Sequence, residues 1–228
     1  MSSTGSEQPI RFTRRDRLVL LLLSVVVLAI SLVMVVRGHS SFLEAVAFAS
    51  GVLCVWMGVK GSIWTFPLGL VNSATYFIVF MEARLYGDMA LQVVYFAMNG
   101  MGWYMWLFGG EQKGALAIRH VGRRELAAVL ISVPVIGIAL WRTLIFMGGA
   151  ASLGDAVTTS ISLGGQWLMN RKFVENWHLW ILADVLYVPL YISRGLHLTA
   201  VLYAAFLVMA VVGLLEWRAQ ARVADARV

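Results

Sequence analysis

Residues 166–191 read Q-W-L-M-N-R-K-F-V-E-N-W-H-L-W-I-L-A-D-V-L-Y-V-P-L-Y, and the rest of the chain is organised around them. It lies among hydrophobic segments that are long enough to cross a bilayer, yet it carries amides, three tryptophans, two tyrosines and a central acid, Asp184. A charge at mid-depth costs about 2.5–3.5 kcal/mol in a membrane, so such groups usually face a bundle interior or a wet cavity. The stretch therefore predicts membrane helices with a polar inner face.

The composition indicates a multi-pass membrane protein. The chain has 228 residues, of which 60% are hydrophobic and 13% are charged. A soluble domain is about 45–50% apolar. The excess falls in blocks of about 20 residues, the length that crosses about 30 Å of hydrocarbon. We expect an all-α protein embedded in the lipid bilayer of the cell (inner) membrane.

No motif of the sequence predicts catalysis. The chain has one cysteine, Cys54, so no intrachain disulfide can form. We find no phosphate-binding glycine loop, no metal-ligand spacing and no nucleophile–base pair. We therefore expect no catalytic residue, no metal and no cofactor, and we expect that the protein is not an enzyme.

Hydrophobic segments predict eight membrane helices. The first, 17–37, is expected to be retained rather than cleaved as a signal peptide, because its apolar run is long and no small-residue cleavage site follows. Polar tails are expected at 1–16 and 219–228, and Pro67, Pro134 and Pro189 are expected inside helices. The other seven helices are predicted at 42–59, 62–81, 88–108, 123–147, 153–170, 174–193 and 196–217.

The placement of the basic residues predicts the topology. Of 18 Lys and Arg residues, only Arg37, Arg84, Arg142 and Arg194 fall outside when eight helices start from a cytoplasmic N-terminus, which leaves 14 inside. This distribution follows the positive-inside rule and predicts that both termini are cytoplasmic. The net charge of +6 is then a topology signal, and no nucleic-acid partner is expected.

An internal duplication is the next expectation. Shifting the sequence by 111 aligns Trp56 with Trp167, Tyr76 with Tyr187, Gly102 with Gly213, and Trp106 with Trp217. Shifts of 113 and 112 add Trp64 with Trp177 and Asn72 with Asp184, which suggests small insertions at turns. The predicted architecture is 3+1+3: a first repeat at 42–110, a linker helix at 123–147 and a second repeat at 153–218. The N-terminal helix stands outside the repeat. Transporters built this way bind substrate at the repeat interface.

Polar and aromatic residues recur at helical spacing on four predicted helices. The four stripes are Thr65, Asn72 and Tyr76; Gln92, Asn99 and Trp103; Asp155, Thr159, Ser162, Gln166 and Asn170; and Trp177, Trp180, Asp184, Tyr187 and Tyr191.

Two interpretations of these stripes stay open. The polar side chains can join helices by hydrogen bonds, or they can line a ligand site. Aromatic faces stack on flat rings and attract cations by roughly 0.5–2 kcal/mol, while amides and an acid bind hydroxyls and a carboxamide. A planar, sugar-bearing heterocycle would fit. Trp64, Trp106 and Trp217 lie near helix ends and are expected to be interfacial anchors.

Several motifs resemble the PnuC family of nicotinamide riboside transporters. The second half carries Q-W-L-M-N-R-K, E-N-W-x-x-W, A-D-V-x-Y-x-P-L-Y and G-L-x-L-T-A-V-L-Y, and the first half carries W-x-F-P-L-G-L-V-N-S and A-L-Q-V-V-Y. The resemblance covers about residues 42–218. It implies a SWEET-like fold, a homo-oligomer with a trimer as one option, and facilitated uptake (uniport) of nicotinamide riboside. It also implies that a cytosolic kinase traps the vitamin.

The resemblance also implies a binding site within the same stretches. The candidate residues are Asn72, Gln92, Asn99, Gln166, Asn170, Asn176, Trp177, Trp180, Asp184 and Tyr187. Related branches of the family carry thiamine or riboflavin, which are also flat and aromatic. A proton-coupled carrier, suggested by Asp184, and a structural or accessory membrane subunit are the remaining alternatives.

Overall fold

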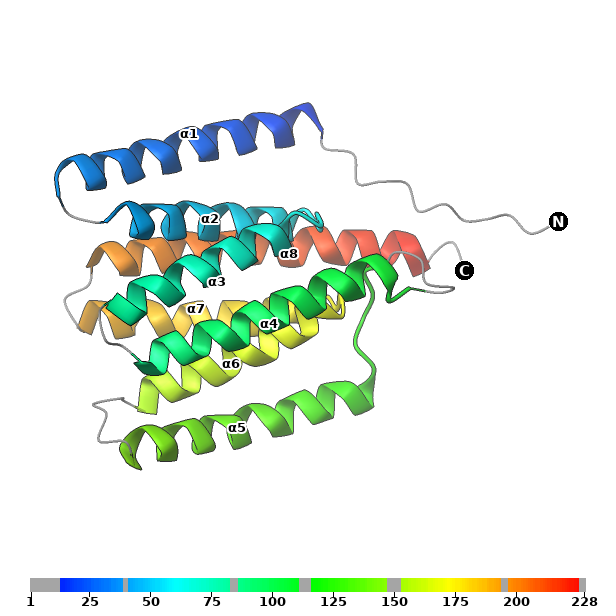
Figure 1. Ribbon diagram of the computed structural model, residues 1–228. Helices are drawn as coiled ribbons and strands as arrows, with labels where there is room; N and C mark the ends of the chain where they lie inside the picture. The colour runs from blue at the N-terminus through cyan, green and yellow to red at the C-terminus, as the bar shows by residue number, and fades with distance from the viewer. Residues whose placement is uncertain are drawn as a thin grey trace. The chain divides into compact units, whose positions relative to one another are not determined.

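The computed structural model describes residues 13–38, 41–82, 86–110, 116–146, 153–193 and 197–225. These residues form eight α-helices, which Figure 1 labels. They are α1 (Arg14–Val36), α2 (Phe42–Val59), α3 (Thr65–Glu82), α4 (Tyr86–Phe108), α5 (Arg123–Phe146), α6 (Leu153–Asn170), α7 (Asn176–Ser193) and α8 (His197–Asp225). The expectation of an all-α chain is confirmed.

Most predicted helix ends agree with the structure within three residues, but the last helix does not. It runs to Asp225, whereas hydropathy ended it at 217. Hydropathy follows the thickness of hydrocarbon, while a helix rich in good helix formers such as Ala and Arg continues beyond it. Pro67 lies in the first turn of α3, where its missing N–H has no partner to lose. Residues 1–12 and 226–228 of the predicted tails lie outside the described residues.

Side chains cap the N-termini of α1 and α2. The Thr13 hydroxyl accepts from the Asp16 N–H at 3.1 Å, and the Asp16 carboxylate accepts from the Thr13 N–H at 2.9 Å. Ser41 and Glu44 make the same pair of bonds at 3.1 and 2.6 Å. Such capping boxes satisfy backbone donors that a helix start leaves free.

The chain divides into two compact units, Met1–Leu116 and Ala117–Val228. In the first unit α1 packs on α2, α2 on α3 and α3 on α4. In the second unit α5 packs on α6, α6 on α7 and α7 on α8 (Figure 1). The helix expected to link two repeats, α5, therefore belongs to the second unit.

Equivalent helices of the two units begin at a constant offset. The starts of α2 and α6 differ by 153 − 42 = 111, those of α3 and α7 by 176 − 65 = 111, and those of α4 and α8 by 197 − 86 = 111. No insertion at the turns is needed. An offset of 111 pairs Phe66 with Trp177 and Ser73 with Asp184, so the pairings predicted at shifts of 113 and 112 do not follow the offset of the helix starts. Trp64 precedes α3, whereas Trp177 is the second residue of α7.

The α2–α3 and α6–α7 turns share their backbone hydrogen bonds. The Ser62 N–H donates to the Met57 carbonyl at 2.9 Å, and its equivalent in the second unit, the Phe173 N–H, donates to the Leu168 carbonyl at 3.0 Å. Gly61 and Lys172 occupy the same left-handed position, with φ of 64° and 54°. This is the Schellman arrangement that ends many helices.

An edge-to-face contact between two aromatic rings joins the third and fourth helices of each unit. Phe66 meets Trp106 with ring centroids 4.8 Å apart and planes at 89°, and Trp177 meets Trp217 at 5.5 Å and 90°. Trp106 and Trp217 are 2% and 0% exposed, so their prediction as interfacial anchors is wrong. Trp64, at 63% exposed, is the tryptophan of the three that lies on the surface.

Four of the described helices can cross a membrane by length and mean hydropathy alone. They are α1, α2, α5 over Arg123–Thr143, and α8 over Ala200–Val223. The helices with the predicted polar stripes, α3, α4, α6 and α7, are not among them. The polar residues that lower hydropathy are thus concentrated in the helices expected to carry the site.

Candidate substrate-binding site

The end of α6 buries an amide pair. Gln166 is 8% exposed and Asn170 is fully buried. The Gln166 Nε2 group donates to the Asn170 Oδ1 atom at 3.0 Å, one helical turn away. Burial of an amide is costly unless its donors and acceptors are paired, so this bond fixes the orientation of both side chains.

Asn176 and Trp177 open α7 with polar atoms that are buried and unpaired. The Asn176 Nδ2 group donates to the Phe173 carbonyl at 2.6 Å, which closes the turn before the helix. Its Oδ1 atom and the Trp177 Nε1 atom are buried and have no hydrogen-bond partner in the described part of the chain. A buried acceptor and a buried donor without partners need an explanation. A ligand or a water molecule that reaches them in another conformation of the protein would provide their hydrogen bonds.

The two tryptophans of α7 face different neighbours. Trp177 is 2% exposed and lies against α8, where a Cβ atom added at Gly213 would come within 2.6 Å of its ring. Trp180 lies against α6, where a Cβ atom at Gly165 would come within 3.3 Å. Small residues on both neighbours therefore make room for the indole rings.

Asp184 is the buried acid in the middle of α7. The residue is 5% exposed and lies among the buried residues of the helix. A buried carboxylate is stable when it meets a cation, a hydrogen-bond donor or a proton. Asp184 is therefore the strongest candidate in α7 for contact with a cationic solute.

Tyr187 belongs to an aromatic group that spans α7 and α8. Its ring stacks on Tyr191 at 5.6 Å and tilts against Tyr203 at 4.5 Å. Tyr203 also contacts Tyr191 at 5.0 Å and Phe206 at 5.6 Å. Tyr203 and Phe206 were absent from the predicted stripes, although the Y-A-A-F spacing of three residues places both on one helix face.

The first unit holds the other three candidates. The Asn72 Nδ2 group donates to the Ala47 carbonyl of α2 at 2.6 Å. Asn99 is 8% exposed, donates to the Tyr95 carbonyl at 2.9 Å, and lies over Gly69, where a Cβ atom would be 2.5 Å from its Oδ1 atom. Gln92 is half-buried on α4. Asn72 therefore serves the α2–α3 contact, and Asn99 the α3–α4 contact.

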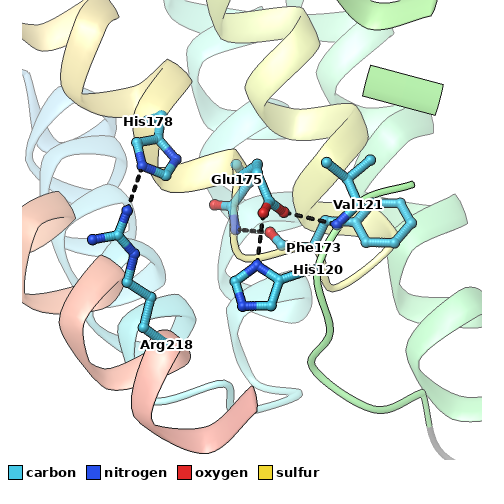
Figure 2. A network of polar contacts seen from close by, with 7 residues as sticks. His120, Val121, Phe173, Glu175, His178 and Arg218 are labelled. Atoms are coloured by element: carbon cyan, nitrogen blue, oxygen red, sulfur yellow. Dashed lines mark hydrogen bonds and ion pairs between the residues drawn. The ribbon is translucent and has the colours of Figure 1, made fainter. Parts of the chain in front are cut away.

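A polar network around Glu175 was not anticipated from the sequence. Its carboxylate accepts from the Val121 N–H at 2.9 Å and lies 2.8 Å from the His120 Nδ1 atom (Figure 2). Nearby, the Arg218 Nη2 atom lies 2.9 Å from the His178 Nε2 atom, which joins α8 to α7. The network ties the segment before α5 to the start of α7, close to Asn176 and Trp177.

The segment before α5 also pairs with the α6–α7 turn through its backbone. The Arg119 N–H donates to the Lys172 carbonyl at 3.2 Å, and the Val174 N–H donates to the Arg119 carbonyl at 3.0 Å. The Arg119 guanidinium lies 5.0 Å from the centre of the Phe173 ring. The turn that precedes Asn176 is therefore held from outside as well as by its own bonds.

Comparison with known proteins identifies the family. A family model described as "Nicotinamide mononucleotide transporter" matches residues 41–219. The nicotinamide riboside transporter PnuC of Haemophilus influenzae is 30% identical over 191 residues, which cover 80% of this chain and 81% of that protein. The riboflavin/roseoflavin transporter RibM of Streptomyces davaonensis is 24% identical over 193 residues, covering 81% and 88%.

A solved structure agrees with this result. The crystal structure of the vitamin B3 transporter PnuC superposes with a TM-score of 0.72 at 27% identity, covering 93% of this chain and 94% of that one. The family model matches well over half of the sequence, and the shared fold extends over nearly all of it. The chain belongs to the nicotinamide mononucleotide transporter family of membrane transporters.

Proposed function

We propose that this protein is a uniporter that carries nicotinamide riboside across the cell membrane by facilitated diffusion. The observation that carries the proposal is the state of α7, where Asp184 is 5% exposed and the Asn176 Oδ1 and Trp177 Nε1 atoms are buried without a hydrogen-bond partner among the described residues. Nicotinamide riboside offers a cationic ring, a carboxamide and ribose hydroxyls, which complement these three groups. Relatives named as nicotinamide riboside transporters support the choice.

All ten residues expected from the sequence are proposed as substrate-binding residues, and each unit is taken by itself. In the second unit these are the amides Gln166, Asn170 and Asn176, the rings of Trp177, Trp180 and Tyr187, and Asp184. In the first unit they are Asn72, Gln92 and Asn99. None of the ten is Lys or Arg. Because a phosphate group binds to cationic side chains and is repelled by a carboxylate, the set favours the riboside over the mononucleotide.

The proposed architecture is a SWEET-like 3+1+3 arrangement, with α2–α4 and α6–α8 as repeats, α5 between them and α1 in addition. The constant offset of 111 between equivalent helix starts supports a duplication. The proposed topology has eight membrane crossings with both termini in the cytoplasm, as the distribution of basic residues predicts.

The absence of a nucleotide-binding motif in the sequence fits a passive carrier. Net uptake by such a carrier needs a sink, so we propose that a cytosolic kinase phosphorylates the arriving riboside. The active form is proposed to be a homo-oligomer, and a trimer is one option.

Riboflavin is the second candidate substrate, because RibM is a relative over most of the chain. Riboflavin is neutral and flat, so it would use the aromatic side chains but not the charge of Asp184. Thiamine, a cationic vitamin, and proton-coupled transport through Asp184 are further alternatives. The charge of the ligand and its dependence on Asp184 separate these possibilities.

A binding titration of the purified protein tests the proposal. We would compare nicotinamide riboside, its uncharged dihydro form, nicotinamide mononucleotide, thiamine and riboflavin. Nicotinamide riboside should bind with the lowest Kd, and Asp184→Asn should raise that Kd at least about tenfold while changing the Kd of the dihydro form much less. The matched control is Val185→Ala, which alters an exposed neighbour on the same helix.

Tighter binding of riboflavin, or equal effects of Asp184→Asn on both forms of the riboside, would contradict the proposal. Uptake into proteoliposomes then distinguishes the mechanisms. A uniporter equilibrates the riboside in the absence of an imposed pH gradient, whereas accumulation driven by such a gradient would indicate proton coupling.

A further inference from the structure

The first helix of each unit begins with the same charge pattern. Arg14-Arg15-Asp16 starts α1, and Arg123-Arg124-Glu125 starts α5, at an offset of 123 − 14 = 109. Each of these helices packs on the helix that follows it (Figure 1). The pattern is a likeness between α1 and α5, the two helices that lie outside the α2–α4 and α6–α8 repeats proposed above.

The acid of each pattern reaches a cation at the end of the next helix. In the first unit the Asp16 Oδ1 atom lies 2.7 Å from the Lys60 Nζ atom. In the second unit the Glu125 Oε1 atom lies 3.2 Å from the Arg171 Nη1 atom. Lys60 and Arg171 are equivalent at the offset of 111.

Each cation also lies over a tryptophan one turn earlier on its own helix. The Lys60 Nζ atom is 5.1 Å from the centre of the Trp56 ring, and the Arg171 guanidinium is 5.9 Å from that of Trp167. A cation within about 6 Å of an indole face is attracted by the ring. An acid, a cation and a tryptophan thus form one triad in each unit, at equivalent places.

The position of the triads in the chain indicates what they do. Lys60 and Arg171 directly precede the left-handed residues Gly61 and Lys172, which end α2 and α6. From these turns start α3 and α7, the helices with Asn72 in one unit and Asn176, Trp177 and Asp184 in the other. A displacement of the cation would therefore be transmitted to the start of a helix that bears candidate site residues.

We propose that Asp16–Lys60–Trp56 and Glu125–Arg171–Trp167 are equivalent positioning triads. Each holds the first helix of its unit on the turn from which the site-bearing helix begins, and α1 is the counterpart of α5. None of the six residues touches substrate in this scheme. The transport readout below depends on the proposed function, whereas the stability readout does not.

The two triads differ in burial, which predicts unequal effects. The side chains of Lys60 and Asp16 are 10% and 19% exposed, and those of Arg171 and Glu125 are 31% and 24% exposed. Solvent weakens the more exposed ion pair. Breaking the triad of the first unit should therefore lower stability more than breaking that of the second.

A double-mutant cycle on thermal unfolding, made without substrate, tests the two ion pairs. The variants are Asp16→Asn, Lys60→Gln and their combination, and Glu125→Gln, Arg171→Gln and their combination. The matched controls Arg15→Gln and Arg124→Gln change exposed residues next to each acid. We expect each double variant to unfold close to its less stable single variant, with the larger shift in the first unit and no shift in the controls. Additive shifts in both cycles would overturn the proposal.

The kinetics of uptake separate positioning from simple stabilisation. We expect Glu125→Gln and Arg171→Gln to raise the KM for nicotinamide riboside about threefold or more. The exchanged pair, Glu125→Arg with Arg171→Glu, should restore KM towards the original value. An unchanged KM in the single variants, or an exchanged pair that performs worse than either of them, would refute the positioning role. If the original protein transports no nicotinamide riboside, the proposed function fails, and the thermal cycles alone decide whether the triads exist.

Discussion

The α2–α3 and α6–α7 turns have the same backbone but present different side chains. Both use the Schellman hydrogen bonds and a left-handed residue at the same place. At the offset of 111, the first turn has Gly61, Trp64 and Pro67 where the second has Lys172, Glu175 and His178. Both turns make the same backbone bonds although their side chains differ. Glu175 and His178 make polar contacts in the second turn that Trp64 and Pro67 cannot make in the first.

The same divergence continues into the helices that follow. Thr65 is buried and donates to the Cys54 carbonyl at 2.9 Å, so its hydroxyl is satisfied. Its counterpart Asn176 is also buried but keeps one atom unpaired within the described part of the chain. Ser73 is replaced by Asp184 at the offset of 111. After turns with the same backbone, α3 therefore begins with a hydrogen-bonded polar side chain and α7 with one that keeps an unpaired atom. We propose that α7 contacts the charged part of the ligand.

The largest effect is expected from filling the space beside Trp177. Gly213→Val would bring its Cβ atom within 2.6 Å of an indole that is 2% exposed and already packed on Trp217. Overpacking of this kind costs about 1–3 kcal/mol. Thermal unfolding in detergent should show a lower midpoint, and ligand binding should weaken if Trp177 contributes to the site.

Gly100→Val is the control for that substitution, because nothing lies within 4 Å of a Cβ atom at Gly100. If Gly213→Val behaved like this control, the close packing of Trp177 against α8 would not limit the side chain at position 213.

An intermediate effect is expected from substituting the left-handed residue of each turn. Gly61→Ala places a Cβ atom at a φ of 64°, which costs about 1–2 kcal/mol. Lys172→Gly relieves the same strain but makes the unfolded chain more flexible, so the two contributions oppose each other and the net change should be smaller. The measured quantity is the unfolding midpoint of each variant. A larger loss for Lys172→Gly than for Gly61→Ala would show that the lysine side chain, and not the backbone alone, maintains the second turn.

The smallest effect is expected from the Glu175 network. Glu175→Gln keeps an oxygen for the Val121 N–H but removes the charge beside His120, whose side chain is 50% exposed. Exposed ion pairs contribute about 0.2–1 kcal/mol, so unfolding should shift only slightly. Glu175→Ala also removes the acceptor of the backbone bond and should cost about 1 kcal/mol more. Equal shifts for the two variants would mean that the bond to Val121 contributes nothing.

Much of the helix pattern could be predicted from the sequence, but the register between the halves could not. The apolar segments and the short polar segments between them located all eight described helices. The matches of Trp56, Tyr76, Gly102 and Trp106 at a shift of 111 have the same offset as the helix starts, and the duplication itself stays a prediction. Trp64 and Asn72 were paired by residue type alone, and residue type does not say where a helix begins.

The buried tryptophans show the same limit. Trp106 and Trp217 lie near helix ends, which is also where interfacial anchors lie, and position along the chain does not distinguish the two roles. Packing against Phe66 and Trp177 decides it. The ten candidate residues stay a prediction from the family resemblance, and the binding and uptake experiments above test them.

The class of protein, the helices and the polar stripes could be predicted without a structure, because hydrophobicity and periodicity are local properties of the chain. Tertiary structure alone decided which polar atoms are satisfied, that α5 packs on α6 as α1 packs on α2, and that an acid from one helix meets a cation over a tryptophan on the next. These features depend on distances between residues far apart in the chain, such as Asp16 and Lys60 or Glu125 and Arg171. Such distances arise only when the helices pack.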